Sequence, residues 1–93
     1  MSNETFASVW DAIEDNPAEA ENMKVRSALM MALERHIHAS GWTQTEAARR
    51  LGVTQPRVSD LLRGKINLFG IDTLINMVAA VGLHVDVRVL ETA

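Results

Sequence analysis

The chain of 93 residues contains no cysteine, few aromatic residues and no long apolar run. The absence of cysteine excludes a disulfide scaffold, a thiol nucleophile and any cysteine-based zinc or iron–sulfur site. The longest apolar runs, Leu29–Leu33 and Met77–Val81, are far shorter than the roughly 20 residues that a membrane span needs. The N-terminus lacks the basic start and apolar core of a signal peptide. We therefore expect a cytoplasmic protein with no membrane segment.

The overall charge is acidic, but the charges are segregated along the chain. The formal net charge is −3, which taken alone argues against a nucleic-acid partner. Residues 1–23 carry six acids and no base, residues 24–65 carry eight bases and three acids, and residues 66–93 have a net charge of −2. Such asymmetry indicates an interaction surface, with helix faces that merely differ in charge as the alternative. The 47% of hydrophobic residues excludes a wholly disordered chain and, at this length, favours one domain.

Hydrophobic periodicity predicts five helices. Their expected ranges are residues 6–13, 17–40, 44–51, 55–63 and 72–81. The expected N-caps are Asn16, Thr43, Thr54 and Asp72, with Thr43 and Glu46 forming a capping box. Glycines 41, 52, 64 and 82 follow the last four helices and can take the left-handed conformation that ends a helix.

The apolar positions of these helices predict the core. On the long helix they are Met23, Leu29, Met30, Leu33 and Ile37. On the two short helices that follow they are Ala47, Ala48, Leu51, Val58, Leu61 and Leu62. On the last helix they are Leu74, Ile75, Val78 and Val81.

The segment Leu83–Leu90 alternates apolar and polar residues, which predicts one half-buried strand. A single strand leaves its backbone hydrogen-bonding groups unpaired, so we expect two copies to pair antiparallel in a twofold dimer. A register centred on Val87 places Asp86 opposite Arg88 of the second copy, whereas neighbouring registers oppose like charges. The expected dimer strand contains Val85, Asp86, Val87, Arg88 and Val89. The alternative is a frayed tail.

The stretch from Gln44 to Arg63 contains the most informative pattern. Two helices are joined by a tight turn at Gly52, with Ala48 four residues before that glycine and Val58 six residues after it. Counting from Gln44, the small residue, the glycine and the branched residue fall at positions five, nine and fifteen, and Leu61 occupies the next core position. This spacing resembles the helix-turn-helix of the phage-repressor-like (Xre) family.

The resemblance extends from about residue 22 to residue 90. Over this range the chain looks like the HigA-type antitoxin branch of that family. With the five predicted helices, the resemblance implies a mainly α, five-helix repressor-like fold that has one C-terminal strand. Its parts are an acidic amphipathic segment at 1–16, a helix-turn-helix DNA-binding domain at 17–82 and a dimerisation strand at 83–93. Such antitoxins repress their own operon and inhibit a ribonuclease-type toxin. We therefore expect a sequence-specific transcriptional regulator, not an enzyme, with operator DNA as its partner. The alternatives are a phage-type repressor without a toxin, or a helical adaptor that does not bind DNA.

The second helix of such a motif enters the major groove with its first residues against the base edges. Its inward residues leave Pro56, Ser59, Asp60 and Arg63 facing outward, with Gln55 and Arg57 on the flanks. Gln55 is the best base reader because its amide can bond adenine bidentately, whereas Arg57 could bind guanine or a phosphate. The candidate DNA-binding residues are Gln44, Thr45, Arg49, Thr54, Gln55, Pro56, Arg57, Ser59, Arg63 and Lys65. Among them, Gln44, Gln55, Pro56 and Ser59 match the family's contact positions.

Asp60 is unexpected on a surface that approaches phosphates. It could accept a hydrogen bond from cytosine N4, or it could hold Arg57 or Arg63 three residues away. We favour the second interpretation.

Other candidate sites are weaker. His36 and His38 point in different directions on one helix and His84 is distant, so we expect no metal and no cofactor. Phe6, Val9, Trp10 and Ile13 form an apolar face beside the six acids of residues 1–23. They either pack on their own domain or dock a basic partner, for which a small basic ribonuclease-type toxin is suited.

Overall fold

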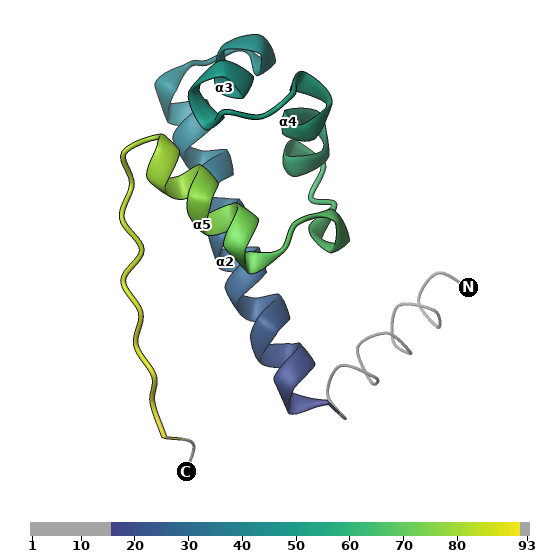
Figure 1. Cartoon of the computed structure of the whole chain (residues 1–93), viewed down its shortest axis with the longest axis vertical. Helices are drawn as coiled ribbons and strands as arrows, with labels where there is room; N and C mark the ends of the chain where they lie inside the picture. The colour runs from purple at the N-terminus through teal and green to yellow at the C-terminus, as the bar shows by residue number, and fades with distance from the viewer. Residues whose placement is uncertain (1–15, 92–93) are drawn as a thin grey trace, which may run out of the picture.

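A computed structural model describes residues 16–91 of the chain. In this range the chain forms four α-helices, α2 (Pro17–Ser40), α3 (Gln44–Leu51), α4 (Gln55–Leu62) and α5 (Ile71–Ala80), and one short 3-10 helix, η1 (Ile66–Leu68) (Figure 1). The prediction of a mainly helical domain is therefore confirmed. The helix expected at 6–13 lies outside the described residues, so the structure supports four of the five predicted α-helices. None of the described helices combines the length and the apolarity needed to cross a membrane.

Side chains and glycines end these helices largely as expected. The Asn16 Oδ1 accepts a 3.2 Å hydrogen bond from the Glu19 N–H, and the Thr43 Oγ1 accepts one of 3.1 Å from the Glu46 N–H. Gly41 ends α2 with a φ of 70°. The N-cap predicted at Asp72 is wrong: α5 begins at Ile71 after Gly70, and Asp72 lies in the first turn. There its negative charge interacts favourably with the helix dipole.

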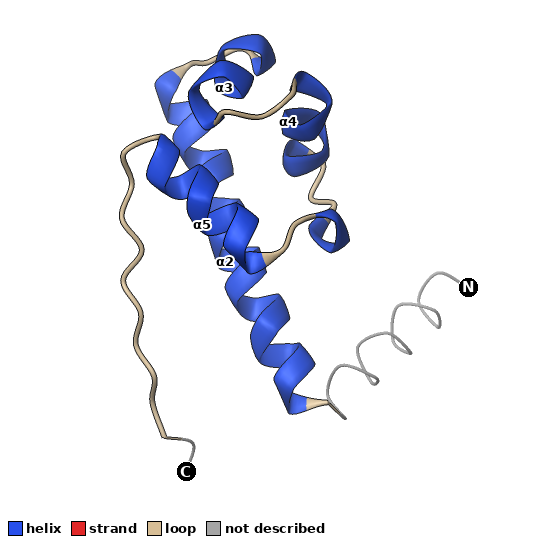
Figure 2. Ribbon diagram, viewed as in Figure 1, coloured by secondary structure: helices blue, strands red, loops and turns tan. Residues whose placement is uncertain are grey.

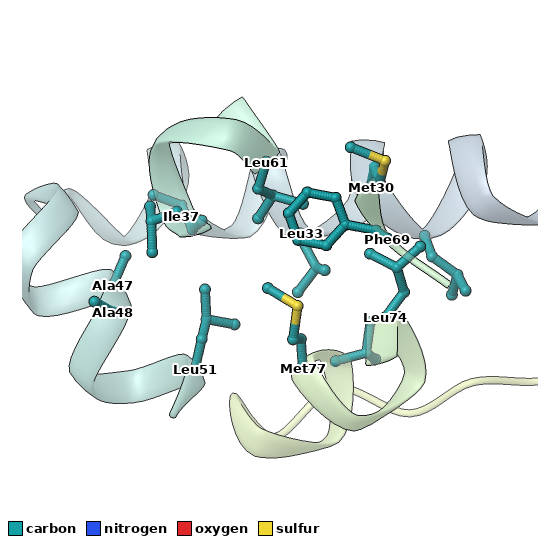
Figure 3. Packing of buried hydrophobic residues seen from close by; sticks show 13 residues of the cluster. Met30, Leu33, Ile37, Ala47, Ala48, Leu51, Leu61, Phe69, Leu74 and Met77 are labelled. Carbon is teal, nitrogen blue, oxygen red and sulfur yellow. The ribbon is translucent and has the colours of Figure 1, made fainter. Parts of the chain in front are cut away.

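The core lies between α2 and the other helices. Helix α2 packs against α5 and η1, and α3 packs against α4 and α5 (Figure 1). The buried side chains form one cluster, shown in Figure 3: Leu29, Met30, Leu33, Ile37, Ala47, Ala48, Leu51, Val58, Leu61, Phe69, Leu74, Met77 and Val78. This single cluster fixes the relative positions of α3 and α4, since both helices contribute to it.

The predicted core was correct for most positions and wrong for a few. Ile75 is 36% exposed, and the neighbouring Met77 is buried in its place. Met23 is only half-buried, and it lies in the N-terminal part of α2 (Pro17–Ser40). The N-terminal end of α2 extends beyond the other helices (Figure 1). Phe69 is fully buried although it belongs to no α-helix, so helical periodicity could not identify it.

The strand predicted at 83–90 is not formed in the structure. Residues 83–91 run as an extended segment, and the described part of the chain contains no strand (Figure 2). A strand requires a neighbouring strand to complete its hydrogen bonds, and a single copy of this chain offers none to this segment. Leu83 and Val85 pack against the core, whereas Val87, Val89 and Leu90 are 73%, 91% and 70% exposed.

Candidate nucleic-acid interface

Helices α3 and α4 form a helix-turn-helix. Gly52 follows α3 with a φ of 72°, a left-handed conformation that glycine adopts without steric cost. The Val53 N–H then donates a 3.0 Å hydrogen bond to the Ala48 carbonyl, which closes the turn. Ala47 and Ala48 are both buried, and their small side chains allow the two helices to approach closely. The predicted motif is therefore present at the predicted residues.

Helix α4 presents its N-terminal residues to solvent. Val58 and Leu61 anchor its inner face with 0% and 2% exposure. Gln55, Pro56 and Arg63 are exposed, and Ser59 is half-buried. Thr54 caps the helix by accepting a 3.4 Å hydrogen bond from the Arg57 N–H, so its hydroxyl also serves the fold. The outward surface of α4 is thus available for contact with a DNA groove.

The exposed side of α3 is organised by Glu46. The candidate residues Gln44 and Thr45 are exposed at its first turn. The Glu46 carboxylate accepts hydrogen bonds from Arg49 and Arg50, with shortest distances of 2.5 and 2.6 Å. These bonds, of which that from Arg49 has the larger effect, lower the pKa of Glu46 below its ordinary value of 4.5. In the expected capping box Glu46 would instead accept from the Thr43 N–H, so only the Thr43 half of the box is formed.

The environment of Asp60 differs from the prediction. Asp60 Oδ1 lies 3.4 Å from Lys65 Nζ, and no ion pair joins it to Arg57 or Arg63 within residues 16–91. The chain reverses at Gly64, which has a φ of 72°, and the Lys65 N–H bonds the Asp60 carbonyl at 3.1 Å. That turn brings Lys65 back beside Asp60. The negative charge of Asp60 is thus offset by a residue that we expected to contact phosphate.

Arg57 is held by an aromatic ring. Its guanidinium carbon lies 4.3 Å from the centroid of the Phe69 ring, and the side chain is half-buried. A second arginine, Arg50, lies 5.3 Å from the centroid of the Trp42 ring. Neither Phe69 nor Arg50 is among the residues predicted from the sequence. The available signal was a single aromatic residue, Phe69, in the linker between Gly64 and α5.

The histidines of α2 have different surroundings. His36 packs edge-on against Trp42 with ring centroids 5.2 Å apart, while His38 is exposed near the end of α2. Among residues 16–91, no group of three His, Asp or Glu side chains could hold a metal ion. Of the other candidate residues, Phe6, Val9, Trp10 and Ile13 lie outside the described range.

Comparisons with known proteins agree with this architecture. A family model described as a helix-turn-helix domain matches residues 12–90. A solved structure named "Putative XRE Family Transcriptional Regulator" is similar to the chain with 30% sequence identity and a TM-score of 0.73. The alignment covers 80% of this chain and 83% of that one. The search of curated proteins gave no match.

Proposed function

Because the chain belongs to the XRE-type helix-turn-helix family of DNA-binding regulators, we propose that it represses its own operon and is the antitoxin of a toxin–antitoxin pair. The observation that carries the DNA-binding part is the exposed start of α4. Gln55 and Pro56 project there from a helix whose opposite side is anchored in the core. A helix presented in this way can enter a major groove with its first residues against the bases.

The proposed contacts divide into base-reading and phosphate-binding groups. Gln55 bonds an adenine, Pro56 touches a thymine methyl and Ser59 donates or accepts at a base edge. Gln44, Thr45 and Arg49 contact phosphates from the start and side of α3, and Arg63 contacts one from the end of α4. The first amides of α3 and α4 add favourable interactions with the same phosphates.

The active form in this proposal is a homodimer joined by residues 83–90. In the Val87-centred register, Val89 of each copy lies opposite Val85 of the other, and Val85 packs on its own core. Pairing therefore covers Val89, which is 91% exposed in the single chain, and supplies the missing backbone partners. The two recognition helices then contact half-sites roughly 34–36 Å apart on one side of the DNA.

Repression of its own operon is tested with a reporter gene placed behind the region upstream of the protein's gene. The wild-type protein should repress the reporter, and the Gln55→Ala variant, produced at the same level, should repress it less. Equal repression by both proteins, or none by either, would contradict the autoregulatory role.

The antitoxin role rests on the resemblance to HigA-type proteins and on the charge of residues 1–23. That segment carries six acids and no base, and its apolar side chains at 6–13 could cover a basic toxin's surface. Removal of residues 1–15 should abolish capture of the protein encoded by the neighbouring gene and leave DNA binding intact. If the shortened chain instead loses thermal stability, residues 6–13 pack on their own domain. A neighbouring gene product that never binds the full chain would favour a repressor without a toxin.

A further inference from the structure

Arg57 differs from the neighbouring basic residues in the group that its side chain contacts. Arg49 and Arg50 donate to Glu46, and Lys65 pairs with Asp60. Within residues 16–91, no carboxylate or carbonyl accepts a hydrogen bond from the Arg57 guanidinium, which is instead held over the Phe69 ring at 4.3 Å. A guanidinium on an aromatic ring keeps its full charge. The Arg57 side chain is therefore held in place while its N–H donors still lack an acceptor.

The Phe69 ring is itself rigidly held. It is fully buried in the cluster that also contains Leu33, Leu61 and Leu74 (Figure 3). Its backbone N–H donates a 3.2 Å hydrogen bond to the carbonyl of Ile66, the first residue of η1. The ring therefore presents a fixed surface to a side chain that would otherwise sample many rotamers.

We propose that Phe69 is a positioning residue for DNA binding, which holds the Arg57 guanidinium at the edge of α4 so that it contacts a backbone phosphate. The guanidinium carries its N–H groups in the plane of the group. When one face of that plane covers the ring, the N–H edges remain free for the bidentate bonds that arginine makes to phosphate.

The position of Arg57 favours phosphate over a base. Its guanidinium lies over Phe69, in the segment between η1 and α5, and so to the side of the helix. The outward direction, toward the floor of a groove, is occupied by Pro56 and Arg63. Phosphates line the two rims of the groove, so a charge at the side of an inserted helix faces a rim.

Fixing the side chain before binding increases affinity. A free arginine loses rotamer entropy when it bonds to DNA, whereas an arginine already held in place loses less. Phe69 should therefore affect DNA affinity only when Arg57 is present. A general effect of Phe69 on folding would lower the affinity whether or not Arg57 is present.

The test is a double-mutant cycle measured by fluorescence anisotropy on a random-sequence duplex long enough for a dimer. Phe69→Leu should weaken binding about three- to tenfold when Arg57 is present and should have no effect in the Arg57→Ala background. Affinities are referred to the folded fraction of each variant. Equal losses in both backgrounds would overturn the proposal. Because random DNA is used, the result does not depend on autorepression or on a toxin.

A second measurement needs no change to the core. Relaxation of the arginine Nε–H groups in the free protein should show restricted motion for Arg57. The matched control is Arg63, an exposed arginine that directly follows the last residue of α4. Equal mobility of the two side chains would also overturn the proposal. A loss of binding to operator DNA alone in Arg57→Ala would show that Arg57 contacts a base and would contradict the assigned phosphate contact.

Discussion

Asp60 and Lys65 form an ion pair, with Oδ1 and Nζ 3.4 Å apart, where the chain leaves α4. Both side chains are partly exposed, so the pair itself contributes little to folding stability. Its importance lies in its place, because it neutralises the acid on the side of α4 that we propose approaches DNA. We propose that Lys65, which pairs with Asp60 in the free protein, contacts a phosphate in the complex with DNA.

Replacement of Lys65 by Ala should weaken binding to every DNA sequence alike. The change removes one phosphate contact, which lowers the salt dependence of the binding constant by about one unit. It also leaves Asp60 unneutralised near the phosphates. Asp60→Asn is the matched control and should tighten binding to all sequences. Anisotropy titrations over a range of salt concentrations measure both effects, and a loss confined to operator DNA would disagree with this assignment.

Replacement of Gln55 by Ala should reduce specificity. The lost bidentate contact costs roughly 1–3 kcal/mol of binding free energy at one base pair and leaves random DNA almost unaffected. Asn76→Ala is a suitable control because Asn76 is also an exposed amide but lies on α5. Competition titrations with operator and random duplexes give the two affinities. Equal losses for both duplexes would refute base contact by Gln55.

The dimer register predicts a charge-reversal rescue. Arg88→Asp places Asp86 opposite an acid in the second copy and should weaken dimerisation at low salt. The double change Asp86→Arg with Arg88→Asp restores opposite charges in the Val87-centred register and should restore the dimer. Sedimentation equilibrium measures the association constant. A double variant that dimerises no better than Arg88→Asp would exclude this register.

The Glu46 cluster predicts a pH dependence of stability. In the folded protein the pKa of Glu46 lies below its ordinary value of 4.5, because Arg49 and, to a smaller extent, Arg50 donate hydrogen bonds to the carboxylate. The stabilisation from this carboxylate is therefore present above about pH 4.5 and disappears as the pH falls through the folded-state pKa. Thermal unfolding of wild type and Glu46→Gln should differ above that window and converge below it. A difference that does not change with pH would show that the carboxylate charge is not responsible.

Much of the helical fold could be predicted because local rules determine it. Asn16, Thr43 and Thr54 cap helices in the structure as their sequence positions indicate. The turn at Gly52 and the buried Val58 likewise follow from spacing alone. These features depend on residues only a few positions apart, and such short-range signals are legible in a sequence.

The remaining features depend on contacts between distant segments. The pairing of Arg57 with Phe69 joins a helix to a linker that has no periodic pattern, and the choice of Met77 over Ile75 depends on how α5 lies against its neighbours. The strand predicted at 83–90 is not formed in the described structure, because a strand needs a neighbouring strand that this single copy does not offer. Of the alternating apolar residues, Leu83 and Val85 pack against the core as expected, whereas Val87 and Val89 are exposed. A ladder cannot form within one copy.

The central claim, that this chain represses its own operon through α3 and α4, is tested most directly by DNA binding. A gel shift compares the region upstream of the protein's own gene with a scrambled duplex of equal length, at low and high salt. The complex on the upstream region should persist at high salt, where the complex on scrambled DNA is lost. Equal affinity for the two duplexes at both salt concentrations would contradict it.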